Sequence, residues 1–186
     1  FLMSLISISN LTFGYEGSID NVFEDVSFQI DSNWKIGLVG RNGRGKTTLL
    51  KLLMDEYPFQ GKIIKSINFD YFPYKIPDAS KLSIDILTEI NPSLMEWEII
   101  KELSLLDMEE DVLYREFDKL SNGEQTKVLL ACLFLKQDNF LLIDEPTNHL
   151  DDYGKEVVSK YLNSKKGFIL VSHDRSFINN CVNYIL

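Results

Sequence analysis

The chain has 186 residues, 45% hydrophobic and 25% charged, which suits one globular domain with a buried core. A formal net charge of -9 at pH 7 argues against direct nucleic-acid binding, because neutralising phosphates requires a basic surface. The longest apolar run, residues 128–135, is far shorter than a membrane span, and the first residues lack the pattern of a secretory signal. Cys132 and Cys181 fit neither a metal motif nor a disulfide framework, so we expect free, buried thiols and a cytoplasmic location.

The first 40 residues read as strands. Val26, Phe28 and Ile30 alternate with polar residues, which is typical of a half-buried strand. Tyr15 follows the first β-rich stretch, and its ring is a candidate for stacking on adenine. Residues 34–40 form a short apolar strand that runs into a glycine-rich turn and then a helix.

This turn matches the pattern G-x-x-x-x-G-K-[ST] in full and lies between a strand and a helix, as the motif requires. Glycines let successive backbone amides face phosphate oxygens, and the helix dipole favours the negative charge. We expect Lys46 to reach the β and γ phosphates and the Thr47 hydroxyl to bind Mg²⁺. The nucleotide-binding residues expected here are Gly40, Arg41, Asn42, Gly43, Arg44, Gly45, Lys46, Thr47 and Thr48.

Residues 61–72 read as another strand pair, and a polar, helical segment follows over residues 80–116. The next helix begins near Ser121, which forms with Glu124 the S-x-x-E spacing of a capping box. The chain already has one helix start that is expected to bind phosphate, at residues 40–47. A second helix start suited to an anion raises the question of which molecule supplies that anion.

An apolar strand over residues 139–146 ends in two carboxylates. We expect Asp144 to hold Mg²⁺, directly or through water, and Glu145 to orient and partly deprotonate the attacking water. His173 follows another apolar strand, at the end where parallel sheets build their sites, and is the candidate for a γ-phosphate contact. Strands and helices alternate throughout the second half of the chain, which predicts a parallel sheet buried on both faces.

Five segments together resemble the nucleotide-binding domain of the ATP-binding cassette (ABC) superfamily. They occur in the order of that family: residues 40–47, LSNGEQ at 120–125, LLIDEP at 141–146, TNHLD at 147–151 and VSHD at 171–174. The resemblance implies an α/β P-loop NTPase cassette with a mainly parallel core sheet, an N-terminal antiparallel β subdomain and a helical subdomain at about residues 78–122. It further implies a single domain over residues 1–186 that hydrolyses ATP with Mg²⁺.

Residues 144–151 and 172–178 resemble the ABC-F branch, whose members carry two tandem cassettes and act on ribosomes. Residues 33–50, 70–74 and 95–106 further resemble the first cassette of Gram-positive antibiotic-resistance proteins of that branch, which protect the ribosome. We therefore expect an N-terminal fragment of a two-cassette protein whose ribosome contacts lie outside this chain.

In this superfamily two cassettes enclose two ATP molecules, each between one P-loop and the opposite signature segment. The resemblance implies that Lys46, Glu145 and His173 act on the chain's own nucleotide, so the isolated chain should hydrolyse ATP weakly. The residues implied to act on a nucleotide bound by the partner cassette are Ser121, Asn122, Gly123, Glu124 and Asp151.

Two residues depart from the family pattern. Asn122 stands where the signature segment usually has glycine; asparagine tolerates left-handed backbone, but its side chain would lie near the phosphate. Tyr74 stands where a glutamine normally helps to hold Mg²⁺, which puts the hydrolysis rate in question more than nucleotide binding.

Two alternatives remain open from the residues alone. The ATPase subunit of a membrane transporter shares all of this chemistry, although its segment corresponding to residues 147–151 usually differs. A regulatory module that binds ATP with little turnover is the other, and Tyr74 and Asn122 keep it under consideration.

Overall fold

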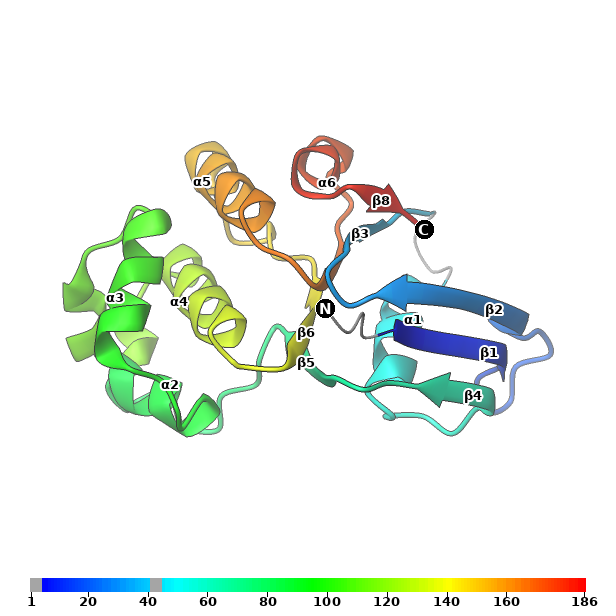
Figure 1. Ribbon diagram of the computed structural model, residues 1–186. Coiled ribbons are helices and arrows are strands. Elements are labelled where there is room, and N and C mark those ends of the chain that lie inside the picture. Colours follow the sequence, from blue (N-terminus) through cyan, green and yellow to red (C-terminus); the bar gives the residue numbers. More distant parts are fainter. Residues whose placement is uncertain (1–4, 41–44) are drawn as a thin grey trace.

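The computed structural model describes residues 5–40 and 45–186 (Figure 1). The elements in chain order are β1 (Leu5–Phe13), β2 (Phe23–Asp31), β3 (Lys35–Leu38), α1 (Lys46–Leu53), β4 (Gln60–Ile64), β5 (Asn68–Phe72), α2 (Ser83–Ile90), α3 (Glu96–Leu105), the 3₁₀ helices η1 (Glu110–Tyr114) and η2 (Phe117–Lys119), α4 (Asn122–Phe134), β6 (Asn139–Asp144), α5 (Asp152–Asn163), β7 (Phe168–Val171), α6 (Arg175–Cys181) and β8 (Tyr184–Ile185).

A five-stranded parallel sheet in the order β5-β6-β7-β3-β8 forms the centre of the molecule. Its strands β6 and β7 are buried along nearly their whole length, because both sheet faces are covered. Successive side chains alternate between the faces: Leu142 and Ile169 face the α1 side, whereas Leu141 and Leu170 belong to the core on the opposite side. The candidate functional side chains at the strand ends follow the same alternation, so their position along the strand decides which face of the sheet they lie on.

The second sheet is antiparallel, with the order β2-β1-β4. Helix α1 lies between it and the parallel sheet, so Leu50 and Leu53 pack in one core with Ile8 of β1 and Leu142 of β6. Figure 1 shows this lobe on the right, with α1 beside the three strands. Burial on both sides holds the start of α1 against the parallel sheet.

The helices α2, α3 and α4 form a second lobe at the other end of the molecule, on the left in Figure 1. Leu87 of α2, Ile99 of α3 and Leu130 of α4 are fully buried in their common core. Helix α4 belongs to this lobe and also packs against β5 and β6, so its first turn lies near the parallel sheet.

The predicted α/β class, the parallel core sheet, the antiparallel β sheet and the helical region are confirmed. The two strands predicted over residues 61–72 are confirmed, but their pairing with each other is wrong, because β4 pairs with β1 in one sheet and β5 pairs with β6 in the other. Both cysteines are buried and free, as expected. Within the described residues, no helix has the length and apolar character needed to cross a membrane.

Candidate functional site

Helix α1 begins at a glycine that no other residue could replace without strain. Gly45 has a left-handed backbone with φ of 91°, and a β-carbon there would lie 2.7 Å from a methyl carbon of Val22. Among residues 5–40 and 45–186, no side chain caps this helix start, so its first amides are left to other acceptors. Lys46 follows directly and donates from Nζ to the Gly40 carbonyl oxygen over 2.9 Å. The predicted residues Arg41, Asn42, Gly43 and Arg44 lie outside the described residues.

Thr47 and Asp144 meet across the gap between α1 and the end of β6. The Thr47 hydroxyl donates to Asp144 Oδ2 over 2.8 Å, as expected if both residues serve one site. The Tyr71 hydroxyl donates to the same oxygen over 2.7 Å. Burial raises the pKa of Tyr71, and the hydrogen bond to Asp144 raises it further, so this hydroxyl keeps its proton.

Asp144 is 9% exposed, and its second oxygen, Oδ1, is buried and has no hydrogen-bond partner among residues 5–40 and 45–186. An ionised carboxylate oxygen left without a partner is costly, and a bound cation removes this cost. A threonine hydroxyl and a carboxylate are hard oxygen ligands, the type that Mg²⁺ prefers. The donor set therefore fits Mg²⁺, with Thr47 and Asp144 as the residues that would hold it.

Glu145 and His173 lie together at the ends of neighbouring strands. Glu145 has a left-handed backbone with φ of 51°, which is uncommon for a residue with a β-carbon, and its amide donates to the Val171 carbonyl over 2.8 Å. This bend directs its carboxylate to His173: Oε2 lies 2.8 Å from Nδ1 and accepts the His173 amide over 3.2 Å. Both predicted residues are thus in one place.

Tyr15 is held by an aromatic group in the antiparallel lobe. Its ring stands edge-on to Phe13, with centroids 5.0 Å apart, and edge-on to Tyr57 at 5.8 Å. Its hydroxyl lies 2.7 Å from the hydroxyl of Thr48, in the first turn of α1. The ring is 44% exposed and so presents free aromatic surface beside the glycine-rich turn.

The first turn of α4 has the predicted capping box. The Ser121 hydroxyl accepts the Glu124 amide over 3.2 Å, and the Glu124 carboxylate accepts the Ser121 amide over 2.7 Å. Arg115, which the sequence analysis did not single out, lies 3.4 Å from the other carboxylate oxygen. Burial raises the pKa of Glu124, but the bonds from Ser121 and the charge of Arg115 outweigh it, so the pKa is lowered overall.

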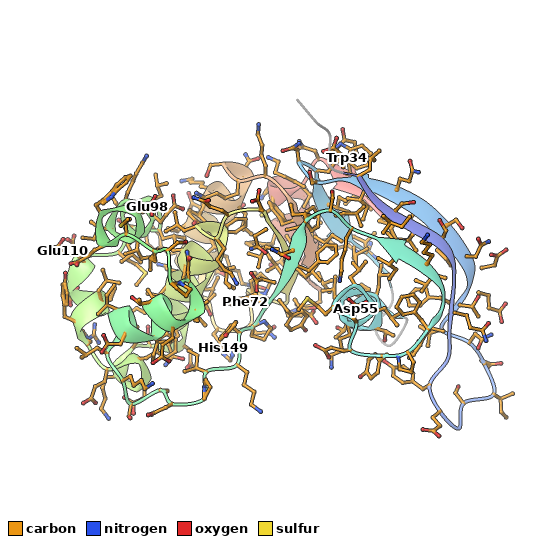
Figure 2. All side chains as sticks on the ribbon, turned by 60° about the horizontal axis from the view of Figure 1, so that its bottom comes forward. Trp34, Asp55, Phe72, Glu98, Glu110 and His149 are labelled. Atoms are coloured by element: carbon orange, nitrogen blue, oxygen red, sulfur yellow. The ribbon has the colours of Figure 1, made fainter. Side chains whose placement is uncertain are left out.

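Asn122 is the first residue of α4 and has helical backbone, so this position does not require the left-handed conformation that motivated the comparison with glycine. Its side chain lines a cavity of about 350 Å³ between the helical lobe and the parallel sheet. Tyr74, Glu145 and His149 line the same cavity, so both departures from the family pattern border the carboxylate at the end of β6. Figure 2 labels His149 and one further lining residue, Phe72, where the two lobes meet.

Asp151 has a structural role within its own chain. Its Oδ1 accepts the Gly154 amide over 2.7 Å and caps α5. The segment before it runs past the start of α4, because a β-carbon on Gly123 would lie 3.4 Å from the His149 carbonyl oxygen. The residues predicted to face a partner cassette, on α4 and before α5, are therefore neighbours.

Tyr71 is the residue at this site that sequence reasoning missed. In the parallel pairing of β5 with β6, Tyr71 is opposite Leu142, two residues before Asp144. Residues two apart on a strand share a face, so Tyr71 and Asp144 project to the same side. Only the pairing of these two strands reveals this, and the predicted pairing had placed β5 elsewhere.

Comparisons with known proteins agree with this fold. The sequence profile of the family described as ABC transporter matches residues 23–148. ABC transporter F family member 2 of Arabidopsis thaliana is 32% identical over 191 residues, which cover 98% of this chain and 28% of that protein. The chain thus spans little more than a quarter of the length of this relative.

Two solved structures share the fold. A structure named RNase-L Inhibitor superimposes with a TM-score of 0.81 and 27% identity, covering 98% of this chain and 36% of that one. A protein described as a metal-chelate type ABC transporter, in an inward-facing conformation, gives a TM-score of 0.78 and 25% identity, covering 100% of this chain and 80% of that one. The second structure is described as an ABC transporter, the family whose profile matches this chain, so the architecture in Figure 1 is that of an ABC cassette.

Proposed function

Because the chain belongs to the ABC transporter family, an ATPase family, we propose that it binds MgATP at the start of α1 and hydrolyses it together with a second cassette. The observation that carries this proposal is the arrangement around Asp144. One carboxylate oxygen is bonded to Thr47 of the phosphate-binding turn, and the other is buried without a partner among the described residues. Thr47 and Asp144 are therefore the residues that would hold the metal ion.

The turn and its lysine bind the phosphates in this proposal. The amides that follow Gly45 have no side-chain cap from the part of the chain that the structure describes and would face the anion, and Lys46 exchanges its bond to the Gly40 carbonyl for one to the β and γ phosphates. Tyr15 stacks on the adenine with its exposed ring, while its bond to Thr48 fixes the ring relative to α1. Bound Mg²⁺ would neutralise charge on the transferred phosphate.

Glu145 is the proposed general base. Its carboxylate lies at the carboxyl end of β6, beside the residues that would hold the metal, and takes a proton from the water that attacks the γ phosphate. His173 contacts the γ phosphate through its ring; Nδ1 faces Glu145, which leaves Nε2 for the phosphate oxygen. The reaction forms no covalent intermediate and proceeds by positioning and charge neutralisation.

The start of α4 serves a nucleotide on the partner cassette. Ser121, Gly123 and Glu124 form a helix start whose anion would come from outside this chain, and Asn122 lines the neighbouring cavity. Asp151 lies beside this helix and reaches across the same interface. The partner is a second cassette of the same polypeptide or a second copy of the chain.

We further propose an ABC-F role in the cytoplasm, in which ATP turnover drives an action on the ribosome, as a translation factor or in antibiotic resistance by ribosomal protection. The relative from Arabidopsis thaliana carries the ABC-F name, which supports the branch. The net charge of -9 indicates that ribosome contacts come from parts outside this cassette.

Steady-state ATP hydrolysis by the full-length protein, measured with and without ribosomes, tests this role. We expect ribosomes to change the rate, and expression in a susceptible bacterium to raise resistance if the protein belongs to the resistance group. Turnover that ribosomes leave unchanged would contradict the ribosomal role. It would favour a transporter ATPase, the candidate to which the likeness to a metal-chelate type transporter points.

A regulatory module with little turnover is the other candidate, and Tyr74 beside Glu145 is the observation that favours it. It predicts tight ATP binding with negligible hydrolysis in every condition. Replacing Tyr74 with glutamine, the residue usual in the family, would then raise the rate. An unchanged rate in that variant would remove the reason for this candidate.

A further inference from the structure

We propose that Tyr71 is a positioning residue that holds the Asp144 carboxylate in the orientation needed for Mg²⁺, an inference that rests on the proposed metal site. The Tyr71 hydroxyl donates to Asp144 Oδ2 over 2.7 Å and is not itself a ligand. Its role is carried out through Asp144.

The hydroxyl determines which oxygen faces the metal. A carboxylate oxygen has two lone pairs, and those of Oδ2 are matched by the hydroxyls of Thr47 and Tyr71. This leaves Oδ1, buried and without a partner among the described residues, as the oxygen available to the cation or to its bound water. Without the Tyr71 hydroxyl, either oxygen of Asp144 could face the metal or accept the Thr47 hydroxyl.

The ring of Tyr71 is fixed independently of the site. The side chain projects from β5 to the α1 face of the sheet and packs in the core that contains Leu50 of α1 and Leu142 of β6. Phenylalanine preserves this packing and removes only the hydroxyl. The Thr47 hydroxyl keeps its bond to Asp144 when it offers a lone pair to the metal, so metal binding does not displace Tyr71.

Tyr71→Phe tests the inference, with Tyr161→Phe as the matched control. Tyr161 is a buried tyrosine whose hydroxyl also donates to a carboxylate, that of Glu102, but it lies in the core on the opposite side of the sheet. Both variants lose one hydrogen bond of the same kind. For each protein, ATP affinity is measured by calorimetry over a series of free Mg²⁺ concentrations and in EDTA, and thermal unfolding is recorded in EDTA without nucleotide.

Mg²⁺ should strengthen ATP binding, and we expect Tyr71→Phe to raise the Mg²⁺ concentration at which half of this increase in affinity is reached by about tenfold or more. An effect of this size is typical for the loss of a residue that orients a metal ligand. ATP affinity in EDTA should stay close to that of the wild type. Tyr161→Phe should lower the unfolding temperature and leave the Mg²⁺ dependence unchanged. The same Mg²⁺ dependence in Tyr71→Phe and the wild type would overturn the inference but leave the ATP site intact. A wild-type chain that binds no ATP with or without Mg²⁺ would overturn both proposals.

Discussion

The carboxylate of Glu145 accepts the backbone amide of His173 and faces its Nδ1 at 2.8 Å. These residues end two neighbouring strands, and the left-handed backbone of Glu145 directs its side chain toward His173. The proposed base and the proposed γ-phosphate contact are therefore coupled in the protein alone. A nucleotide that contacts His173 would therefore also affect the position of Glu145.

Replacing Glu145 with glutamine should abolish turnover and retain the shape of the site. The amide oxygen can still accept the His173 amide, but it cannot take a proton from water, so hydrolysis should fall by about 10²–10⁴-fold. The full-length protein should then accumulate in a closed, ATP-bound state, which retention of radiolabelled ATP on gel filtration would detect. Glu156→Gln, an exposed residue paired with Lys160 on α5, is the control. Unchanged turnover in Glu145→Gln would exclude Glu145 as the base.

Gly45→Ala should destabilise the fold. Alanine at φ of 91° costs about 1–2 kcal/mol, and its β-carbon would meet Val22 at 2.7 Å, which adds to this cost. Gly123→Ala is the control, because that glycine is helical, and alanine there meets its neighbours only at ordinary van der Waals distances and gains up to about 1 kcal/mol of helix propensity. Urea unfolding should separate the two variants. Equal stability would show that α1 does not begin in a left-handed conformation in solution.

Two substitutions at Asp151 separate its capping role from its proposed role at a partner cassette. Asp151→Ala should lose about 1 kcal/mol of unfolding free energy with the α5 cap, whereas Asp151→Asn should keep the cap and the stability. If the carboxylate acts across the cassette interface, both variants should lose ATP turnover in the full-length protein. Wild-type turnover in Asp151→Asn would show that the charge is not needed there.

The capping carboxylate of Glu124 predicts a pH dependence of stability. Its pKa in the folded protein is lowered from the ordinary 4.5, so ionised Glu124 favours folding at pH values above 4.5. This contribution is lost as the pH falls below 4.5 through the lowered pKa. Glutamine also fits a capping box, so the stability difference between wild type and Glu124→Gln reports the charge.

We expect wild type to be more stable than Glu124→Gln at pH 7, and the difference to vanish in acid, when measured by chemical unfolding at a series of pH values. Ser121→Ala is the companion variant, because it loses a neutral hydroxyl and should cost about 1 kcal/mol at every pH. A difference for Glu124→Gln that persists unchanged into acid would contradict the lowered pKa.

Local patterns in the sequence were sufficient for much of the fold. Alternation at Val26, Phe28 and Ile30 predicted β2, and the buried runs before Glu145 and His173 predicted β6 and β7. Spacing alone identified the capping box of Ser121 and Glu124, because both partners lie within one helical turn. These features depend on interactions between near neighbours in the chain.

Features that depend on strand pairing could not be predicted from the sequence. The strands β4 and β5 are adjacent in sequence and were expected to pair, yet β5 lies beside β6, about seventy residues later in the chain. The Tyr71 hydrogen bond to Asp144 follows from that pairing, and so does the place of Tyr74 in the cavity with Glu145. No spacing rule relates these residues.

The sequence by itself determined the α/β class and the order of the segments, and it predicted the roles proposed for Lys46, Thr47, Asp144, Glu145 and His173, because each prediction rests on a short contiguous pattern. The tertiary structure alone decided that Tyr71 reaches Asp144, that Arg115 reaches Glu124 and that the start of α4 lies beside His149. The physical reason is that a strand carries two usable faces and several possible neighbours. The choice among them is made by the packing of the whole core, which is a sum over residues distant in the chain.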